Sequence, residues 1–311
     1  MRQEALNLCE NPRRRALGLL AGLAAVGLAG CQTPPQPSAP VAPAAPPPPP
    51  APPRPPRLGL ALGGGAARGF AHIGVIQGLE EAGIRPDLVV GTSAGSLVAA
   101  LYAAGRTGAE LATLAQSMDE GAITDWSFPG RGLIRGEALA RYVRDQTGQR
   151  PIEQMRLPLG VVATDLDSGA PVLFRRGDTG AAVRASSAVP AVFQPVKIGE
   201  REYVDGGLVS PVPVRFAREM GAELVLAVDI SSPPDGAATG DPFRMLLQTF
   251  AIMGKSINHF ELAGADVVLR PRLAGIGSAN FTARSRAIDA GRQAMQAALP
   301  ELRAKITSLT R

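Results

Sequence analysis

One serine in the sequence stands where nucleophilic chemistry could occur. Residues 91–95 read Gly-Thr-Ser-Ala-Gly and match the pattern G-x-S-x-G around Ser93. The apolar residues 88–90 predict a strand before it, and good helix formers predict a helix after it, up to residue 104. Gly91 and Gly95 permit the sharp turn between strand and helix, and the helix N-terminus favours developing negative charge beside the hydroxyl. The alternative interpretation is a structural turn without chemistry.

A second glycine-rich turn follows the apolar run 58–62 and opens another helical stretch. Its residues Gly63, Gly64 and Gly65 expose bare backbone amides, which form a nest suited to an anion. In a hydrolase these amides would stabilise an oxyanion. In a dinucleotide-binding protein they would approach a pyrophosphate, but that site wants an acidic residue about 20 positions later. The second predicted strand ends instead in the Ser93 turn.

A serine hydroxyl needs a base, and the chain contains two histidines. His72 falls on the helix directly after the glycine turn, where we expect packing or hydrogen bonding rather than catalysis. His259 follows the serine in the chain, as an α/β-hydrolase histidine does, but it lies inside a helical run, 243–262, instead of on a loop. It is therefore a candidate base by chain order alone.

A carboxylate is the other possible base. Asp205 follows an apolar segment and precedes Gly206 and Gly207, so it is placed on a tight turn. An aspartate within hydrogen-bond reach can accept the serine proton if burial raises its basicity. A plain β-turn is the alternative for an Asp-Gly-Gly string.

These three segments, in this order, resemble the patatin-like phospholipase family. The similarity covers most of residues 58–215 and includes 68–75 beside the glycine turn and 184–190 between the serine and the aspartate. One departure is an extra residue before Gly69 relative to the family's G-x-G-x-x-G, which leaves the particular oxyanion donors open.

The resemblance implies a Ser-Asp dyad in which Ser93 is the nucleophile and Asp205 the general base. It implies an oxyanion hole formed by the amides of the glycine turn and its neighbour, namely Gly63, Gly64, Gly65 and Arg68. Arg68 would steady the turn or meet a lipid phosphate, and an ordinary solvated arginine is the alternative. No metal and no cofactor are implied, and the implied substrates are acyl esters of lipids such as phospholipids or lysophospholipids.

The segments that must hold these residues alternate between short apolar runs and helical stretches. Strands are predicted at 58–62, 88–90, 159–163, 171–174, 224–230 and 266–269, and helices at 67–82, 96–104, 243–262 and 287–305. Consecutive apolar residues fit strands covered on both faces, so we predict an α/β fold. A largely parallel sheet between helices, in three α/β/α layers of the patatin-like type, is expected as one domain over 58–305. Residues 243–253 would border an acyl-binding groove or pack in the core.

The N-terminus predicts export and a lipid anchor. A basic start at 13–15 and an apolar stretch at 16–29 are typical of a signal peptide over residues 1–30. It ends Leu-Ala-Gly before Cys31, which resembles the lipobox of bacterial lipoproteins and implies acylation of Cys31 and attachment to a membrane. Residues 31–57 form a Pro/Ala-rich linker. Gln32 favours the outer membrane of the cell envelope, facing the periplasm. An ordinary cleaved signal with an incidental cysteine is the alternative.

The charge and cysteine content of the chain argue against some classes of function. The formal charge of +5 falls to +3 without the four arginines and two glutamates of the first 30 residues, which argues against nucleic acid as a partner. Cys9 and Cys31 both precede the predicted domain, so the domain contains no disulfide. The rival hypothesis is a non-catalytic, membrane-tethered lipid-binding or scaffold lipoprotein, followed by a dinucleotide-binding protein. The sequence makes no prediction of oligomeric state.

Overall fold

The computed structural model describes residues 53–119, 121, 125–126, 131–232, 242–277 and 279–311. The predicted signal peptide, Cys31 and most of the linker lie outside these residues. Within the described part of the chain, no helix combines the length and the apolar character needed to cross a bilayer.

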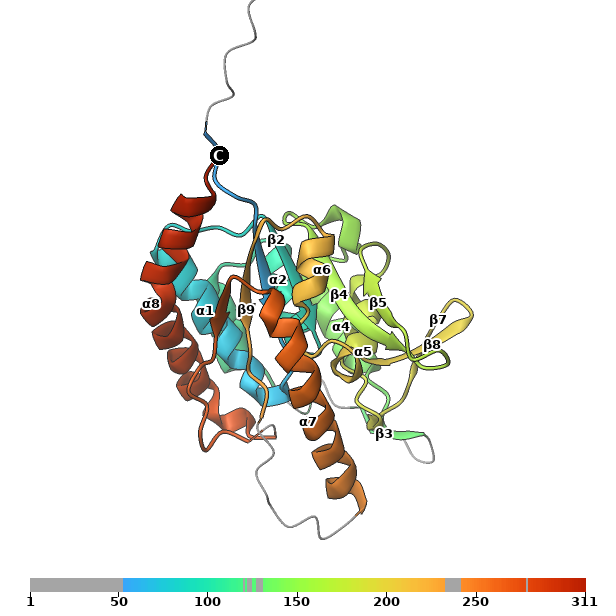
Figure 1. Cartoon of the computed structure of the whole chain (residues 1–311). Coiled ribbons are helices and arrows are strands. Elements are labelled where there is room, and N and C mark those ends of the chain that lie inside the picture. The colour runs from blue at the N-terminus through green and yellow to red at the C-terminus, as the bar shows by residue number, and fades with distance from the viewer. Residues whose placement is uncertain (1–52, 120, 122–124, 127–130, 233–241, 278) are drawn as a thin grey trace, which may run out of the picture. The chain divides into compact units, whose positions relative to one another are not determined.

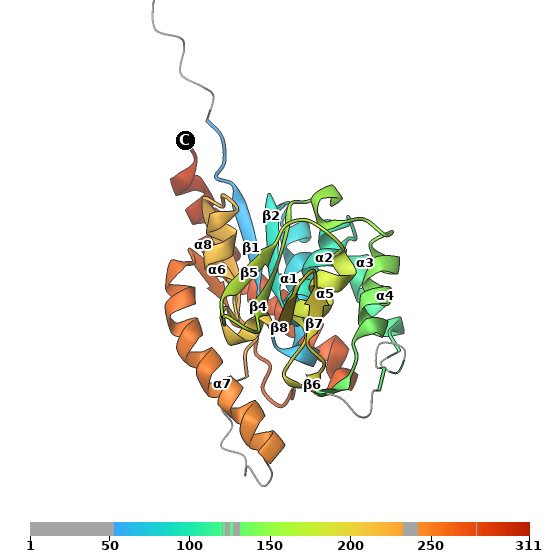
Figure 2. The same ribbon diagram turned by 90° about the vertical axis from the view of Figure 1, so that its right-hand side faces the viewer.

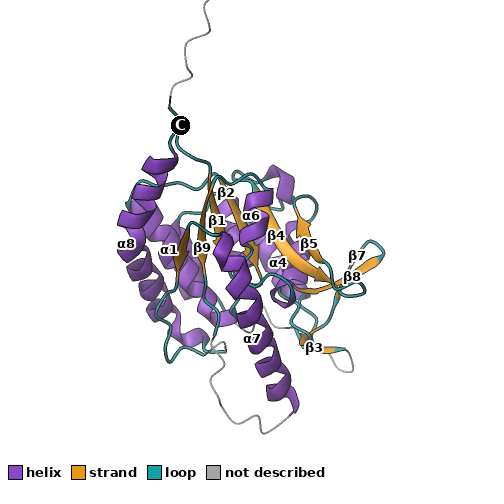
Figure 3. Ribbon diagram, viewed as in Figure 1, coloured by secondary structure: helices purple, strands orange, loops and turns teal. Residues whose placement is uncertain are grey.

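A single large sheet organises the described chain, with strand order β10-β9-β1-β2-β4-β8-β7 and β5 paired to β4 (Figure 3). Pairing is parallel from β10 to β4 and antiparallel at β5, β8 and β7. The strands are β1 Leu58–Leu62, β2 Leu88–Thr92, β3 Gly132–Ile134, β4 Leu159–Asp165, β5 Pro171–Phe174, β6 Ala191–Phe193, β7 Val196–Ile198, β8 Arg201–Asp205, β9 Leu224–Val228 and β10 Val267–Leu269. The short strands β3 and β6 form a separate pair. The predicted, mostly parallel α/β sheet is confirmed.

Helices cover both faces of this sheet (Figures 1 and 2). They are α1 Phe70–Glu81, α2 Ala94–Ala103, α3 Gly108–Ser117, α4 Glu137–Gln146, α5 Thr179–Ser186, α6 Val214–Glu219, α7 Pro242–Glu261 and α8 Arg284–Leu309. Leu60 and Leu62 of β1 face a core shared with α1, α2 and α8, whereas Ala61 faces the core that contains α6. Because each central strand is covered on both sides, its residues are buried consecutively, as the sequence pattern predicted.

Some boundaries differ from the predicted ones. The helix expected at 67–82 begins as a 3₁₀ turn, Ala66–Gly69, because Ala66 has a left-handed φ of 49° and the chain must bend out of the glycine turn. The closing helix runs over 284–309 rather than 287–305 and continues through Pro300. The strand expected at 224–230 ends at Val228.

Candidate active site

Ser93 lies in the sharp turn between β2 and α2, at the edge where the parallel strands end. Its φ of 52° and ψ of −125° are strained for a residue with a side chain. Both flanking glycines are required sterically, since a β-carbon at Gly91 would collide with the carbonyl of Gly95, and one at Gly95 with the carbonyl of Leu62. The sequence around Ser93 therefore folds into the strand, turn and helix that it predicts.

The backbone of Ser93 is held from a neighbouring helix. Its amide donates a 2.8 Å hydrogen bond to Oγ of Ser186, at the end of α5, and that hydroxyl donates to the carbonyl of Val162 on β4 at 2.5 Å. Ser186 is fully buried. It belongs to the segment 184–190, which the sequence singled out only by resemblance, and a lone serine carries no signal for this positioning role.

Asp205 ends β8, which pairs antiparallel with β4 so that Asp205 lies opposite Ala163. Since β4 also pairs with β2, one strand, β4, separates the strand that carries the aspartate from the strand that precedes Ser93. Its Oδ1 accepts a 2.7 Å hydrogen bond from the amide of Gly207. A β-carbon at Gly206 would collide with the carbonyl of Val162. The structure of this turn therefore explains why both residues after the aspartate are glycines.

Burial changes the chemistry of this carboxyl. Asp205 is 6 % exposed. Loss of solvation raises its pKa from 3.8 to about 6, against the smaller lowering effects of a hydrogen-bonding interaction with the Ser93 side chain and the bond from Gly207. Its Oδ2 is buried and has no well-formed hydrogen bond within the described residues. Ser93 thus influences this carboxyl without forming a fully aligned hydrogen bond to it.

The glycine turn offers fewer free amides than its sequence suggests. The amide of Gly63 donates to the carbonyl of Val228 at 3.1 Å, and that of Gly64 to the carbonyl of Pro211 at 2.9 Å. Neither is therefore free to bind an oxyanion in this structure, which revises two of the predicted donors. The amides of Gly65 and Ala94 have no acceptor in the described chain. These two amides remain available to bind an oxyanion.

Gly64 lies against the nucleophile. A β-carbon at this position would be 3.2 Å from Cβ and 3.9 Å from Oγ of Ser93. We therefore predict that Gly64→Ala lowers kcat/KM for an acyl ester by roughly 10- to 100-fold, because it displaces the hydroxyl or fills the space that a reacting carbonyl needs.

The matched control for this substitution is Gly277→Ala, where a β-carbon would meet nothing within 4 Å. Both variants should melt close to wild type in circular dichroism, since neither glycine has a left-handed φ. Equal activity of the two variants would contradict the placement of Gly64 over Ser93.

His72 supports the glycine turn, as predicted, rather than the reaction. It is fully buried on α1, and its Nε2 lies 2.8 Å from the carbonyl of Gly63. Desolvation lowers its pKa to about 4, so the ring is neutral at physiological pH and Nε2 donates this bond as an N–H.

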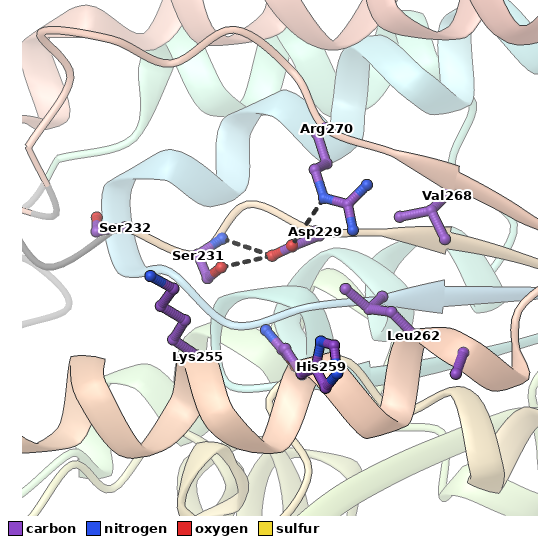
Figure 4. Close-up of a pocket in the computed structure, with 10 residues that line it drawn as sticks. Asp229, Ser231, Ser232, Lys255, His259, Leu262, Val268 and Arg270 are labelled. Atoms are coloured by element: carbon purple, nitrogen blue, oxygen red, sulfur yellow. Dashed lines mark hydrogen bonds and ion pairs between the residues drawn. The ribbon is translucent and has the colours of Figure 1, made fainter.

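His259 lines a pocket beside α7 (Figure 4), and Arg68 hydrogen-bonds two of the other residues that line it. The Arg68 guanidinium donates to Oγ of Ser232 at 2.9 Å and to the carbonyl of Ser231 at 3.0 Å, and both serines line this pocket. Arg68 therefore ties the helix after the glycine turn to the segment after β9, and its predicted place in the oxyanion hole is not supported. His259 lines this pocket together with Asp229, whereas neither Ser93 nor Asp205 lines it.

Within the described residues, no group of side chains matches a metal site or a dinucleotide site. The described residues contain no cluster of three or more His, Cys, Asp or Glu side chains that could hold a metal ion. The acidic residue that a dinucleotide site would place at the tip of the second strand is replaced by the Ser93 turn. The polar chemistry at this edge of the sheet is that of a serine and a buried carboxyl.

Comparison with known proteins relates this chain to a family. Residues 60–218 match the model of the family described as patatin-like phospholipase. An uncharacterised NTE family protein of Mycobacterium tuberculosis is 41 % identical over 185 residues, which is 58 % of this chain and 51 % of that protein. The mouse patatin-like phospholipase domain-containing protein 6 is 35 % identical over 232 residues, or 71 % of this chain and 16 % of that protein.

Among solved structures, VipD of Legionella pneumophila superposes with a TM-score of 0.57 at 16 % identity. The match covers 79 % of this chain and 67 % of VipD, and it shows a shared fold. The chain spans about half the length of the M. tuberculosis relative, so the match does not extend to that whole protein.

Proposed function

The chain belongs to the patatin-like phospholipase family, and we propose that it is a serine acyl-ester hydrolase acting on lipids through a Ser93–Asp205 dyad. The observation that carries the proposal is the pairing of a serine on a strained turn with a buried carboxyl whose pKa is raised to about 6. A carboxylate of that pKa is ionised at neutral pH and is a better base than an ordinary aspartate.

In the proposed first step, Oγ of Ser93 attacks the ester carbonyl carbon while its proton passes to Oδ2 of Asp205. That oxygen has no well-formed hydrogen bond within the described residues, so it is free to take the proton. The tetrahedral intermediate then expels the alcohol, which recovers the proton from Asp205, and the acyl group remains on Ser93.

The oxyanion of this intermediate needs donors that are not already committed. We assign this role to the amides of Gly65 and of Ala94, the first residue of α2, because neither has an acceptor in the described chain. The N-terminus of α2 adds a favourable dipole. In the second step, Asp205 takes a proton from water while the water oxygen attacks the acyl carbon, the new tetrahedral intermediate expels Oγ of Ser93 and releases the fatty acid, and Oγ recovers the proton from Asp205.

Lipid acyl esters are the proposed substrate class, with phospholipids or lysophospholipids first. Support comes from the family's description and from the name of the mouse relative. The direct test is release of fatty acid from a lysophospholipid, and of p-nitrophenol from a short-chain ester, by the wild-type chain. Turnover of either is expected, and inactivity toward every acyl ester would return the chain to the lipid-binding or scaffold hypothesis.

The raised pKa of Asp205 predicts the pH dependence. The carboxyl must be ionised to accept the serine proton, so kcat/KM for a soluble ester should be level above pH 6 and fall about tenfold per pH unit well below it. A pH profile of the wild type checks this. A profile with its midpoint near 3.8, the usual value for aspartate, would show that Asp205 is not desolvated during the reaction.

We also propose that Cys31 is acylated and holds the domain at the bacterial cell envelope, on the periplasmic face of the outer membrane. The support is the apolar run ending in Leu-Ala-Gly-Cys and the Pro/Ala-rich linker that follows. Cys31→Ser should move the chain from the membrane to the soluble fraction of cells, because two or more acyl chains are lost. Unchanged fractionation of the variant would contradict the proposed lipid anchor at Cys31.

A further inference from the structure

Helix α7 carries large apolar side chains on its solvent-facing side. Met245, Ile252, Met253 and Phe260 are 56, 52, 45 and 78 % exposed. They are spaced 7, 8 and 15 positions from the first, so at about 100° per residue they fall within roughly a third of the helix circumference. We call these four residues the α7 stripe. A surface helix normally turns polar residues outward, so the stripe requires an explanation.

Contacts on the inner side of α7 hold the helix in place, although its outer side is apolar. Oγ of Ser210 donates a 2.8 Å hydrogen bond to Glu261, which also forms an ion pair with Arg215 at 3.0 Å. A β-carbon at Gly254 would be 3.7 Å from the Pro211 side chain. The helix is therefore fixed through its buried face, while the side chains of the stripe stay largely exposed.

The same contact lies next to the catalytic residues. The carbonyl of Ser210 accepts a 2.9 Å hydrogen bond from Oγ1 of Thr92, the residue before Ser93. The carbonyl of Pro211 accepts from the amide of Gly64, which lies against Ser93. In Figure 1, the N-terminal half of α7 extends past the edge at which β1, β2 and β9 end. A surface that covered the stripe would therefore lie beside the active site.

The charges on α7 match an anionic lipid surface. Its cationic side chains are those of Arg244 and Lys255, both exposed, and Lys255 forms no ion pair within the described residues. Its one carboxylate, Glu261, has a side chain 7 % exposed and already paired. Apolar residues flanked by cations, without exposed carboxylates, are typical of helices that lie in a membrane interface.

An exposed tryptophan at the end of the molecule toward which α7 extends also fits an anionic lipid surface. Trp126 is 70 % exposed and forms a bridge with Ile134 of β3. Figure 1 shows β3 at the end of the molecule toward which α7 extends. Tryptophan concentrates at membrane interfaces because its ring is apolar and its N–H is polar.

From these observations we propose that the α7 stripe is a docking surface for an anionic phospholipid membrane, which it holds against the active-site edge. This proposal deepens the proposed function and rests on it, because docking would bring the hydrolase to its lipid substrate. The docking itself is tested by a measurement that does not depend on hydrolysis. The occupant is the lipid surface, and a second copy of the chain is the alternative that the test must exclude.

The experiment places a bimane probe at one thiol in the full-length chain carrying Cys9→Ser and Cys31→Ser. One variant adds Ile252→Cys in the stripe. Its matched control adds Ala304→Cys, an exposed position near the end of α8, close to the C-terminus at the opposite end of the molecule (Figure 1). Each is mixed with vesicles of phosphatidylcholine and phosphatidylglycerol, with and without acyl chains that carry a doxyl quencher.

We expect the probe at 252 to shift to shorter wavelength and to be quenched by the doxyl lipid, and the probe at 304 to do neither. Absence of both changes at 252 would overturn the proposal. So would a dimer, seen by sedimentation velocity without lipid, that Met245→Gln with Ile252→Gln dissociates, since that result assigns the stripe to a second copy. Hydrolysis of a soluble ester by wild type is scored separately, so failure of the proposed function and failure of the docking surface remain distinguishable.

Discussion

Ser93→Ala should lower kcat/KM for a soluble acyl ester by about 10⁴- to 10⁶-fold, because removal of the nucleophile leaves only binding and oxyanion stabilisation. The fold should survive. Alanine retains the β-carbon at the strained turn, and the backbone amide still donates to Ser186. Steady-state hydrolysis of a p-nitrophenyl ester measures the loss, and circular dichroism reports the melting temperature.

The control for this substitution is Ser308→Ala, an exposed serine on α8. It should retain wild-type kcat/KM. A Ser93→Ala variant that stays folded and active would show that another group performs the attack, and it would contradict the proposed mechanism.

Asp205→Asn should lower kcat/KM by about 10²- to 10⁴-fold, because the amide cannot accept the serine proton. Asparagine keeps the size of the side chain and its Oδ1 can still accept from Gly207, so positioning is preserved. Asp167→Asn, at an exposed turn after β4, is the matched control and should remain active. Full activity of Asp205→Asn would assign the base to a different residue.

The same variant should be more stable than wild type at alkaline pH. The folded-state pKa of Asp205 is raised from 3.8 to about 6, so the folded chain binds its proton more readily than the unfolded chain. Wild-type stability from this group therefore falls as pH rises through that window, by on the order of 3 kcal/mol at most. Urea unfolding above and below the window measures the difference. Equal stability of both proteins above pH 6 would argue against a buried charge.

Local sequence predicted the turns that carry Ser93 and Asp205 because each turn lies in a short segment with its own geometry. Gly91 and Gly95 leave few conformations other than the sharp turn that carries Ser93, and Gly206 and Gly207 do the same for the turn after Asp205. Runs of consecutive apolar residues predicted the parallel sheet, since burial of a strand on both faces favours apolar residues at successive positions.

The parts that the sequence could not predict depend on contacts between distant segments. Which amides of the glycine turn are free is decided by the carbonyls of Val228 and Pro211, far along the chain. Ser186 positions Ser93 only because α5 packs beside β4. Neither partner has a local pattern that would reveal it.

The run 243–253 shows the same limit in another form. Its apolar residues were expected in the core or beside an acyl groove, yet Met245, Ile252 and Met253 face solvent in the described structure. Apolar residues on several sides of a helix do not say which side packs, and the inner side of α7 is set by Glu261 and Gly254.

The measurement that tests the catalytic account most directly is labelling of the full-length chain with a fluorophosphonate, followed by proteolysis and mass spectrometry. A serine activated by a neighbouring base reacts with this reagent, whereas ordinary serines do not. The account predicts one adduct, on Ser93, that is absent from Ser93→Ala and strongly reduced in Asp205→Asn. No adduct, or an adduct on a different serine, would contradict it.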